Sequence, residues 1–247
     1  MQIDFLGTNG WFDTETGNTP CVSIKTEEFD ILLDAGNGIH KADRYIHGDR
    51  PVHLFLSHFH LDHIAGLHIL SRFRFPKGLF IRGQPGTREI LSRIVCPPYT
   101  VSFENLPYPV QISDLSEGSH STPFPLESRY LVHSSPCFGY RFNLQGTVIA
   151  YCTDTGYCDA AVELGRDADL LITECAFRSE QEIADWPHLR PEDAVRIAKE
   201  AHAKRLALMH FDASQYQTLE ERMNIREKFG NEFPDLFIAC DGLRITI

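Results

Sequence analysis

The segment from Ser57 to His63 holds more ligand-type side chains than any packing requirement explains. It reads Ser-His-Phe-His-Leu-Asp-His, so three imidazoles and one carboxylate fall within six consecutive residues. Alternate side chains of an extended segment point to the same side, so His58 and His60 can converge on one cation. Asp62 and His63 can then serve a second cation nearby, because imidazole and carboxylate donors suit transition metals. The pattern predicts two adjacent metal sites.

Chance clustering is the alternative, because the chain has 12 histidines in 247 residues. The placement of the segment argues against it. Residues 52–56 form an apolar run that predicts a buried strand, and residues 64–67 predict the start of a helix. Sites in α/β folds lie at the carboxyl ends of strands. We therefore interpret the segment as metal-binding.

Four further residues of ligand type follow short apolar runs, each of which predicts a strand. These residues are His133, Asp154, Glu174 and His210. Packing alone gives no reason for polar groups at the ends of four separate buried strands. For Asp154 a role as a helix N-cap stays open. His188 lies in a loop just before a helix predicted to start at Pro191.

The pattern His-x-His-x-Asp-His after a strand resembles the signature of the metallo-β-lactamase-fold hydrolases. This resemblance implies an α/β (α+β) fold, a four-layer αββα sandwich that holds one or two metals, usually zinc. By analogy, the first metal takes His58, His60 and His133, the second takes Asp62, His63 and His210, and Asp154 bridges them. Two divalent ions are expected, with zinc first and manganese or iron as alternatives. Asp34 is implied to support the ligand loop, although a turn-forming role is equally open.

Three later motifs narrow the resemblance. They are Glu-Cys-Ala-Phe at 174–177, His-x-x-Pro-Glu-Asp-Ala from 188 and Leu-Met-His-Phe at 208–211. They are similar to the ribonuclease Z branch, including its related small phosphodiesterases. The likeness places Glu174 and His188 in the catalytic apparatus. We expect His188 to protonate the leaving alkoxide and Glu174 to hold its tautomer, while Asp62 orients the metal-bridging hydroxide that attacks phosphorus.

The sequence departs from ribonuclease Z in one informative place. That enzyme carries a long arm for transfer RNA between the third His and the bridging Asp. Only twenty residues separate His133 from Asp154, so no such arm fits. The formal net charge of −11 also disfavours nucleic acid, because Lys and Arg provide most of the affinity for phosphate backbones.

The expected function is therefore hydrolysis of a small, anionic phosphodiester, which can be cyclic. A thioester or lactone hydrolase with the same dinuclear site is the alternative, followed by an RNA-processing nuclease. Related enzymes for cyclic ribosyl phosphates often carry a Cys-rich zinc loop near the N-terminus, where this chain has only Cys21. Relatives often pair, so a homodimer is a further expectation.

Length and composition favour one domain. The 247 residues are 43% hydrophobic and nothing among them reads as a linker, so we expect a single domain over residues 1–247. The first residues show no basic leader with an apolar core, and no apolar run is long enough to cross a bilayer. A soluble, cytoplasmic protein without membrane contact is expected. The seven scattered cysteines are expected to be reduced and buried.

The predicted ligand set gives a first test. Because it can hold two cations, the protein expressed with ample metal should carry about two transition-metal ions per chain. Elemental analysis of the purified protein measures this ratio. A protein without bound metal would contradict the interpretation of the histidine segment.

Overall fold

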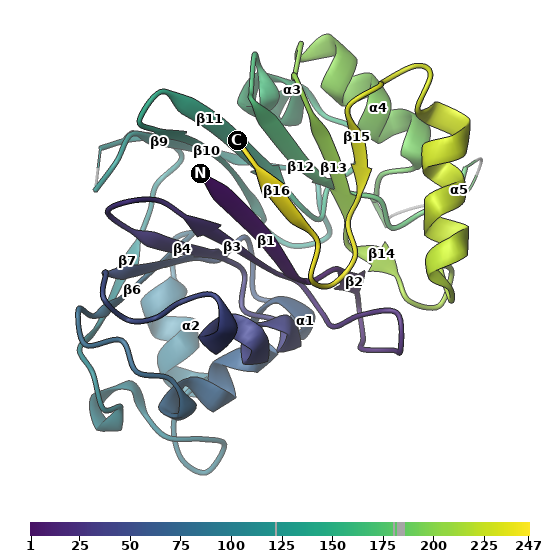
Figure 1. The fold of residues 1–247 in the computed structure, drawn as a ribbon. Helices are drawn as coiled ribbons and strands as arrows, with labels where there is room; N and C mark the ends of the chain where they lie inside the picture. The colour runs from purple at the N-terminus through teal and green to yellow at the C-terminus, as the bar shows by residue number, and fades with distance from the viewer. Residues whose placement is uncertain (122, 180, 182–185) are drawn as a thin grey trace. The chain divides into compact units, whose positions relative to one another are not determined.

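The computed structural model describes all of residues 1–247 except 122, 180 and 182–185 (Figure 1). The chain divides into two compact units. Unit 1 comprises Met1–Gly7, Asn18–Ser116 and Asp241–Ile247, and unit 2 comprises Thr8–Gly17 and Glu117–Cys240. Each unit contains one seven-stranded sheet with its own helices. The expected α/β class is confirmed, whereas a single domain over 1–247 stays a prediction.

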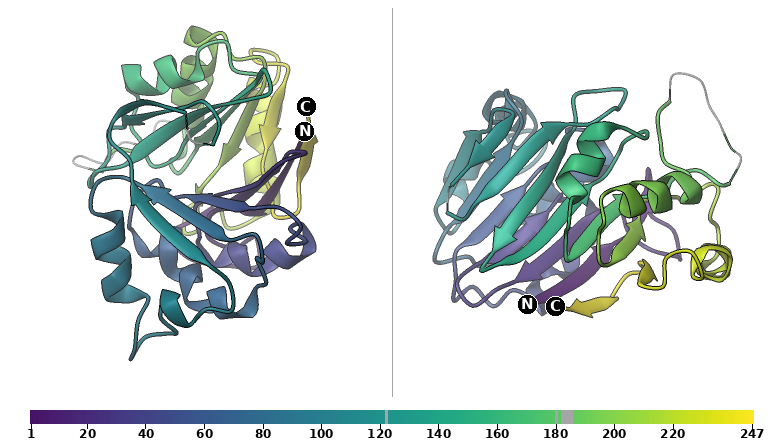
Figure 2. Two further views of the ribbon diagram at one scale, coloured as in Figure 1. Left: turned by 90° about the vertical axis from the view of Figure 1, so that its left-hand side faces the viewer. Right: turned by 90° about the horizontal axis from the view of Figure 1, so that it is seen from above.

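The sheet of unit 1 changes from antiparallel to parallel at its middle strand, β4. Its strands in spatial order are β16 (Arg244–Thr246), β1 (Gln2–Gly7), β3 (Cys21–Lys25), β4 (Asp30–Leu33), β5 (Val52–Phe55), β6 (Leu79–Gly83) and β7 (Val110–Asp114). Pairing is antiparallel from β16 to β4 and parallel from β4 to β7. The chain ends meet here, since the amino group of Met1 donates to the Ile247 carbonyl at 2.5 Å (Figure 2).

Five short helical segments belong to unit 1. They are η1 (Asn37–Arg44), α1 (Leu61–Ile64), η2 (Ala65–Arg72), α2 (Thr87–Ile94) and η3 (Phe103–Asn105). The helix expected from residue 64 onward exists, but most of it is the tighter 3₁₀ form. Its start is packed closely, because a Cβ at Gly66 would lie 2.3 Å from the Gly36 carbonyl oxygen. Apolar side chains from η1, η2 and α2 join those of the strands in one core.

The sheet of unit 2 follows the same scheme. Its strands in spatial order are β15 (Leu236–Ile238), β13 (Leu206–Met209), β12 (Leu170–Glu174), β11 (Thr147–Cys152), β10 (Phe138–Leu144), β9 (Leu126–Tyr130) and β8 (Gly118–His120). Pairing is parallel from β15 to β11 and antiparallel from β11 to β8. The parallel strands β12 and β13 are buried throughout, which explains their unbroken apolar runs.

Three helices pack beside this sheet: α3 (Asp159–Gly165) along β10 and β11, α4 (Pro191–Glu200) along β12 and β13, and α5 (Leu219–Phe229) beside β15 (Figure 1). Helix α5 begins directly after Thr218, which is its N-cap and forms a capping box with Glu221. A short parallel bridge joins β2 (Asn9–Gly10) to β14 (Phe211–Asp212).

Two expectations need correction. The run before His133 was expected to end a strand there, but β9 ends at Tyr130 and Leu131 already donates to the Cys137 carbonyl across the turn to β10. His133 therefore lies in the connection, and its neighbour Val132 is 50% exposed. All seven cysteines are free, as expected, but only four of them are buried. None of the described helices is long and apolar enough to span a membrane.

Candidate metal centre

The predicted ligands of unit 1 cluster at the carboxyl end of β5. The ring centroid of His58 lies 4.4 Å from that of His60 and 4.2 Å from that of His63. His60 is the last extended residue before α1, and Asp62 and His63 fall on the first turn of that helix. An Asp62 oxygen lies 3.5 Å from Nε2 of His63. The strand end and the helix start thus gather all four side chains.

Asp34, directly after β4, fixes this cluster from behind. Its Oδ1 accepts the Ser57 amide at 2.7 Å, and its Oδ2 accepts Nδ1–H of His63 at 2.8 Å. A carboxylate acceptor keeps the proton on Nδ1, so Nε2 of the neutral ring is the atom that can bind a cation. Asp34 has a left-handed backbone with φ 57°, a conformation that Asp adopts more readily than most residues. These contacts favour the supporting role over a simple turn.

The predicted ligands of unit 2 meet around Asp154, two residues beyond β11. One Asp154 oxygen lies 3.0 Å from Nε2 of His210 and the other lies 3.7 Å from Nε2 of His133. Asp154 and His210 are both left-handed, with φ 53°. Helix α3 has Cys158 at its N-cap, so the capping role considered for Asp154 is wrong.

Glu174 and His188 form a buried pair beside this group. Nδ1 of His188 lies 2.7 Å from Oε1 of Glu174. The fully buried carboxylate also accepts backbone amides from Thr155 at 2.6 Å and from Ala176 and Leu189 at 3.2 Å, so its orientation is fixed. One atom each of Asp154, His188 and His210 lie within 4.8 Å of one another.

The protonation of His188 reflects two opposed effects. Burial lowers the pKa of the imidazole because it removes water from the charged form. The charge of Glu174 and its hydrogen bond act in the opposite direction, and the carboxylates of Asp154 and Asp212 add to them. The net effect raises the pKa of His188 to about 9.

The donor set fits a transition metal. Asp154, His133 and His210 are almost fully buried side chains that present imidazole nitrogen and carboxylate oxygen, the donors that zinc, manganese and iron accept. The predicted assignment to two metals combines ligands of both units, and it stays a prediction.

Comparison with known proteins gives the family. A family model described as the β-lactamase superfamily domain matches residues 30–211, which include every predicted ligand and both Glu174 and His188. The chain belongs to the β-lactamase superfamily. That superfamily fold implies divalent metal ions, and the chain is a metallo-hydrolase of this class.

Two curated relatives of the superfamily match most of the chain. The "Probable metallo-hydrolase YhfI" of Bacillus subtilis (strain 168) is 27% identical over 215 residues, covering 85% of this chain and 86% of the relative. The ribonuclease Z of Bacillus thuringiensis (strain Al Hakam) is 27% identical over 298 residues, covering 94% and 95%. The second alignment exceeds the 247 residues of this chain, so it contains ribonuclease Z segments without a counterpart here.

Solved structures of superfamily members confirm the metallo-β-lactamase fold. YhfI from Bacillus subtilis matches with a TM-score of 0.81 and 23% identity, covering 99% of this chain and 98% of that one. The short form of human tRNase Z matches with a TM-score of 0.77 and 24% identity, covering 100% and 99%. A diphosphatase from the PhnP family matches with a TM-score of 0.72 and 19% identity, covering 100% and 97%.

The side chains that support His210 were not predicted from the sequence. Arg222 of α5 is fully buried and donates to Asn9 Oδ1 at 2.6 Å and to Thr16 Oγ1 at 2.7 Å. Its guanidinium also lies 4.9 Å from the ring centroid of Phe211, the residue after His210. The available signal was a charged residue on the buried stripe of the helix, which Arg222 shares with Ile225 and Phe229.

The loop of residues 8–17, which Arg222 holds, contacts the imidazole of His210 directly. A Cβ placed on Gly10 would lie 2.7 Å from two atoms of the His210 ring, so only glycine permits this close approach. The β2–β14 bridge pairs Asn9 with Phe211 and keeps the loop in register. Arg222 therefore positions His210 indirectly, through its contacts with the loop of residues 8–17 and with Phe211.

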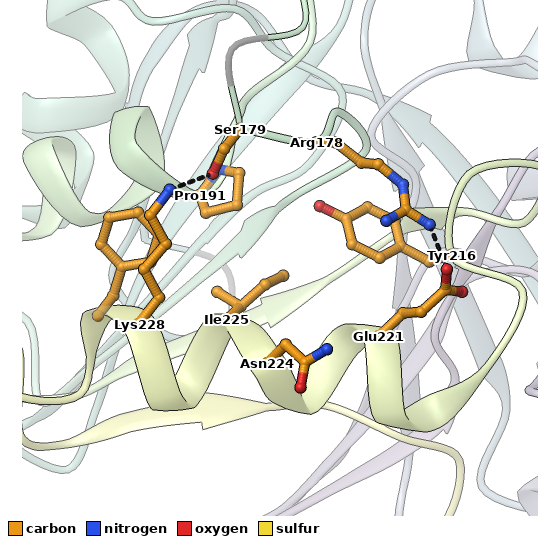
Figure 3. A pocket seen from close by; sticks show the side chains of 9 residues that line it. Arg178, Ser179, Pro191, Tyr216, Glu221, Asn224, Ile225 and Lys228 are labelled. Atoms are coloured by element: carbon orange, nitrogen blue, oxygen red, sulfur yellow. Dashed lines mark hydrogen bonds and ion pairs between the residues drawn. The ribbon is translucent and has the colours of Figure 1, made fainter.

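A separate pocket of about 280 Å³ lies along α5 (Figure 3). Its walls include Tyr216 and Ile225 but none of the predicted ligands. Its charged groups are engaged with one another or with polar neighbours, since Arg178 pairs with Glu221 at 2.5 Å and Lys228 donates to Ser179 at 3.0 Å. The predicted metal ligands lie at the strand ends and outside this pocket.

The buried arginine yields a stability test. Arg222→Met should lower the free energy of unfolding by about 2–4 kcal/mol, because the buried Asn9 and the partly buried Thr16 lose the donor to their side-chain oxygens. Chemical denaturation measures the loss, and zinc titration should show weaker metal binding. Arg196→Met on α4, which removes an exposed arginine, is the control and should cost much less. Equal losses in the two variants would contradict the positioning role.

The His188 pKa yields a pH test. In the metal-free protein, NMR of the labelled ring should show titration at about pH 9, and bound zinc should lower this pKa because cations repel the imidazolium. A raised folded-state pKa stabilises the protein fully below about pH 6.5, and this contribution is lost as the pH rises through about 9. Glu174→Gln should lower the pKa. A wild-type value near 6.5 without metal would refute the assignment.

Proposed function

We propose that the chain is a dinuclear metal-dependent phosphodiesterase that acts on a small, anionic phosphodiester. The observation that carries the proposal is the buried Glu174–His188 pair, joined at 2.7 Å beside Asp154 and His210. A carboxylate can hold a metal-binding imidazole in the same way, as Asp34 holds His63, but the seven ligands of the family signature already serve both ions and leave His188 for proton transfer. A phosphodiesterase needs it, because the departing alkoxide must be protonated.

The proposed ligands are those of the family signature, with zinc as the first choice. They are His58, His60 and His133 for one ion, Asp62, His63 and His210 for the other, and Asp154 for both. Two bound cations would activate a water molecule and neutralise charge on the phosphoryl oxygens. Asp34 supports this arrangement by keeping Nε2 of His63 available, as its hydrogen bond to Nδ1 requires.

The remaining steps belong to side chains of the chain itself. Asp62 orients the attacking water and takes its proton. His188 directs Nε2 away from Glu174 and gives its proton to the leaving oxygen, while Glu174 holds the other ring nitrogen. Because four hydrogen bonds fix the Glu174 carboxylate, the imidazole keeps one orientation through the reaction.

His188 also has a second candidate role. Its ligand atom lies close enough to those of Asp154 and His210 to share a metal with them. A ligand and an acid respond differently to substitution, because loss of a ligand weakens metal binding whereas loss of the acid leaves the metals in place. We favour the acid, since the seven proposed ligands already serve the two ions and a phosphodiesterase still needs a group that protonates the leaving oxygen.

Two features support a small substrate. The residues between His133 and Asp154 are used almost entirely by the β10–β11 hairpin, which leaves no length for an RNA-binding arm. The net charge of −11 disfavours long polyanions. Relatives include enzymes named for RNA as well as a diphosphatase, so the family leaves both classes open. A cytoplasmic location and a homodimer also stay predictions.

Substitution of His188 tests the proposal. His188→Ala should lower kcat on adenosine 2′,3′-cyclic phosphate by about 10²–10⁴-fold, since an alkoxide leaving group needs a proton. The loss should be smaller on bis(p-nitrophenyl) phosphate, whose leaving group is stable as an anion. About two metals per chain should remain by elemental analysis. The exposed His202, substituted by Ala, is the control.

Three results would count against the proposal. Loss of metal from His188→Ala would show that His188 is a metal ligand. An unchanged kcat would show that His188 takes no part in the reaction. A panel of linear and cyclic phosphodiesters, thioesters, lactones and precursor transfer RNA decides the substrate class. Turnover confined to thioesters or lactones, or cleavage of the transfer RNA precursor, would replace the proposed function.

A further inference from the structure

The chain has two tryptophans, and both are exposed: Trp11 by 68% and Trp186 by 47%. Trp186 lies against the proposed catalytic group. Its ring centroid is 5.7 Å from that of His188, tilted by 52°, and 6.4 Å from that of His133, in an edge-on arrangement. An apolar aromatic surface is therefore presented to solvent beside two imidazoles.

The backbone after Trp186 is anchored by several contacts. A Cβ on Gly156 would lie 3.1 Å from Cβ of Pro187, so the proline ring packs directly on this glycine. His188 is bonded to Glu174, and Leu189 donates to the same carboxylate. The indole thus extends from a segment whose next three residues are all held in place. An indole has only two rotatable side-chain bonds, so on this anchored backbone it can bind a ligand at little cost in conformational entropy.

The position relative to His188 defines which part of a substrate the indole can reach. Hydrolysis adds one water: the bond from phosphorus to the leaving oxygen breaks, that oxygen receives the proton of His188, and the hydroxide portion stays on phosphorus. The leaving alcohol must therefore lie on the His188 side of the phosphorus. Trp186 is in ring contact with His188, so it adjoins the leaving oxygen and the group that carries it, which in a cyclic ester stays joined to phosphorus through its second oxygen.

We propose that Trp186 forms the leaving-group subsite and selects phosphodiesters whose leaving alcohol carries a planar aromatic group, such as a nucleoside or an aryl alcohol. Aromatic rings stack on indole with little dependence on their substituents. The exposed Val132, which lies 3.8 Å from the position of a Cβ on Gly156, extends the apolar surface. This inference rests on the proposed phosphodiesterase function.

A matched pair of cyclic esters tests the subsite. Trp186→Ala should raise KM for adenosine 2′,3′-cyclic phosphate by about tenfold or more, while KM for glycerol 1,2-cyclic phosphate, which has no aromatic group, stays within about twofold. Trp186→Phe should retain most of the selectivity. Tyr99→Ala, which removes a tyrosine exposed by 73% in unit 1, is the control and should change neither KM.

Equal losses on the two esters would show that Trp186 is only structural, and no loss on either would remove it from binding. Thermal unfolding of each variant shows whether the fold is retained. Equal losses and absent losses both refute the leaving-group subsite. Hydrolysis of both esters by the wild-type protein would still support the proposed function.

Fluorescence gives a readout that needs no turnover. Trp11→Phe leaves Trp186 as the sole tryptophan, and Trp186→Phe leaves Trp11. In the zinc-loaded proteins, adenosine 3′-monophosphate, a product of the adenosine cyclic ester, should quench the fluorescence of the Trp11→Phe protein, and glycerol 1-phosphate, a product of the glycerol cyclic ester, should not. The Trp186→Phe protein should respond to neither. Quenching confined to the Trp186→Phe protein, or equal quenching by both ligands, would overturn the subsite.

The two experiments separate the two proposals. Selective quenching without hydrolysis of either ester would mean that the aromatic subsite exists and that the phosphodiesterase function is wrong. Hydrolysis of both esters without base-dependent quenching would leave the function standing and remove the subsite alone.

Discussion

Hydrogen bonds from imidazole N–H groups to buried carboxylates set the geometry of the candidate centre in each unit. Asp34 at the end of β4 holds His63, and Glu174 at the end of β12 holds His188. Strand β4 is parallel to β5, and β12 is parallel to β11, and parallel strands end at the same edge of a sheet. A carboxylate after one strand can therefore reach a side chain that follows the next. Every proposed role, from ligand to acid, depends on imidazole rings that are oriented in this way.

The backbone contributes a second constraint. Asp34, Asp154 and His210 each follow a parallel strand and each is left-handed, with φ of 57°, 53° and 53°. This conformation costs residues with a Cβ on the order of 1 kcal/mol or more, and hydrogen bonds at the strand ends offset it. The two sheets also repeat one scheme, since Asp34 follows β4 and Asp154 follows β11, the strands at which antiparallel pairing changes to parallel.

Much of this architecture could be predicted because buried parallel strands leave a plain trace in the sequence. The apolar run of residues 52–56 became β5, and the runs that precede Asp154, Glu174 and His210 became β11, β12 and β13. The strand predicted to end at His133 ends earlier, at Tyr130, because apolar residues continue past the end of β9 into a turn. Arg222 and the loop of residues 8–17 left no comparable trace, since their contacts join positions more than 200 residues apart. The pairing of Glu174 with His188 was expected from family likeness, and the distance between them agrees with it.

The chain does not finish one unit before it begins the other. After β1 it leaves the first sheet, forms the support of His210 with residues 8–17, and only then returns to build β3. Its last residues go back to the first sheet as β16. A cut between Ser116 and Glu117 would consequently yield two incomplete fragments. The first would contain residues 8–17, which belong to unit 2, and the second would contain β16, the edge strand of the sheet of unit 1. Such halves are suited to reassembly on mixing, in a split enzyme whose activity reports their association.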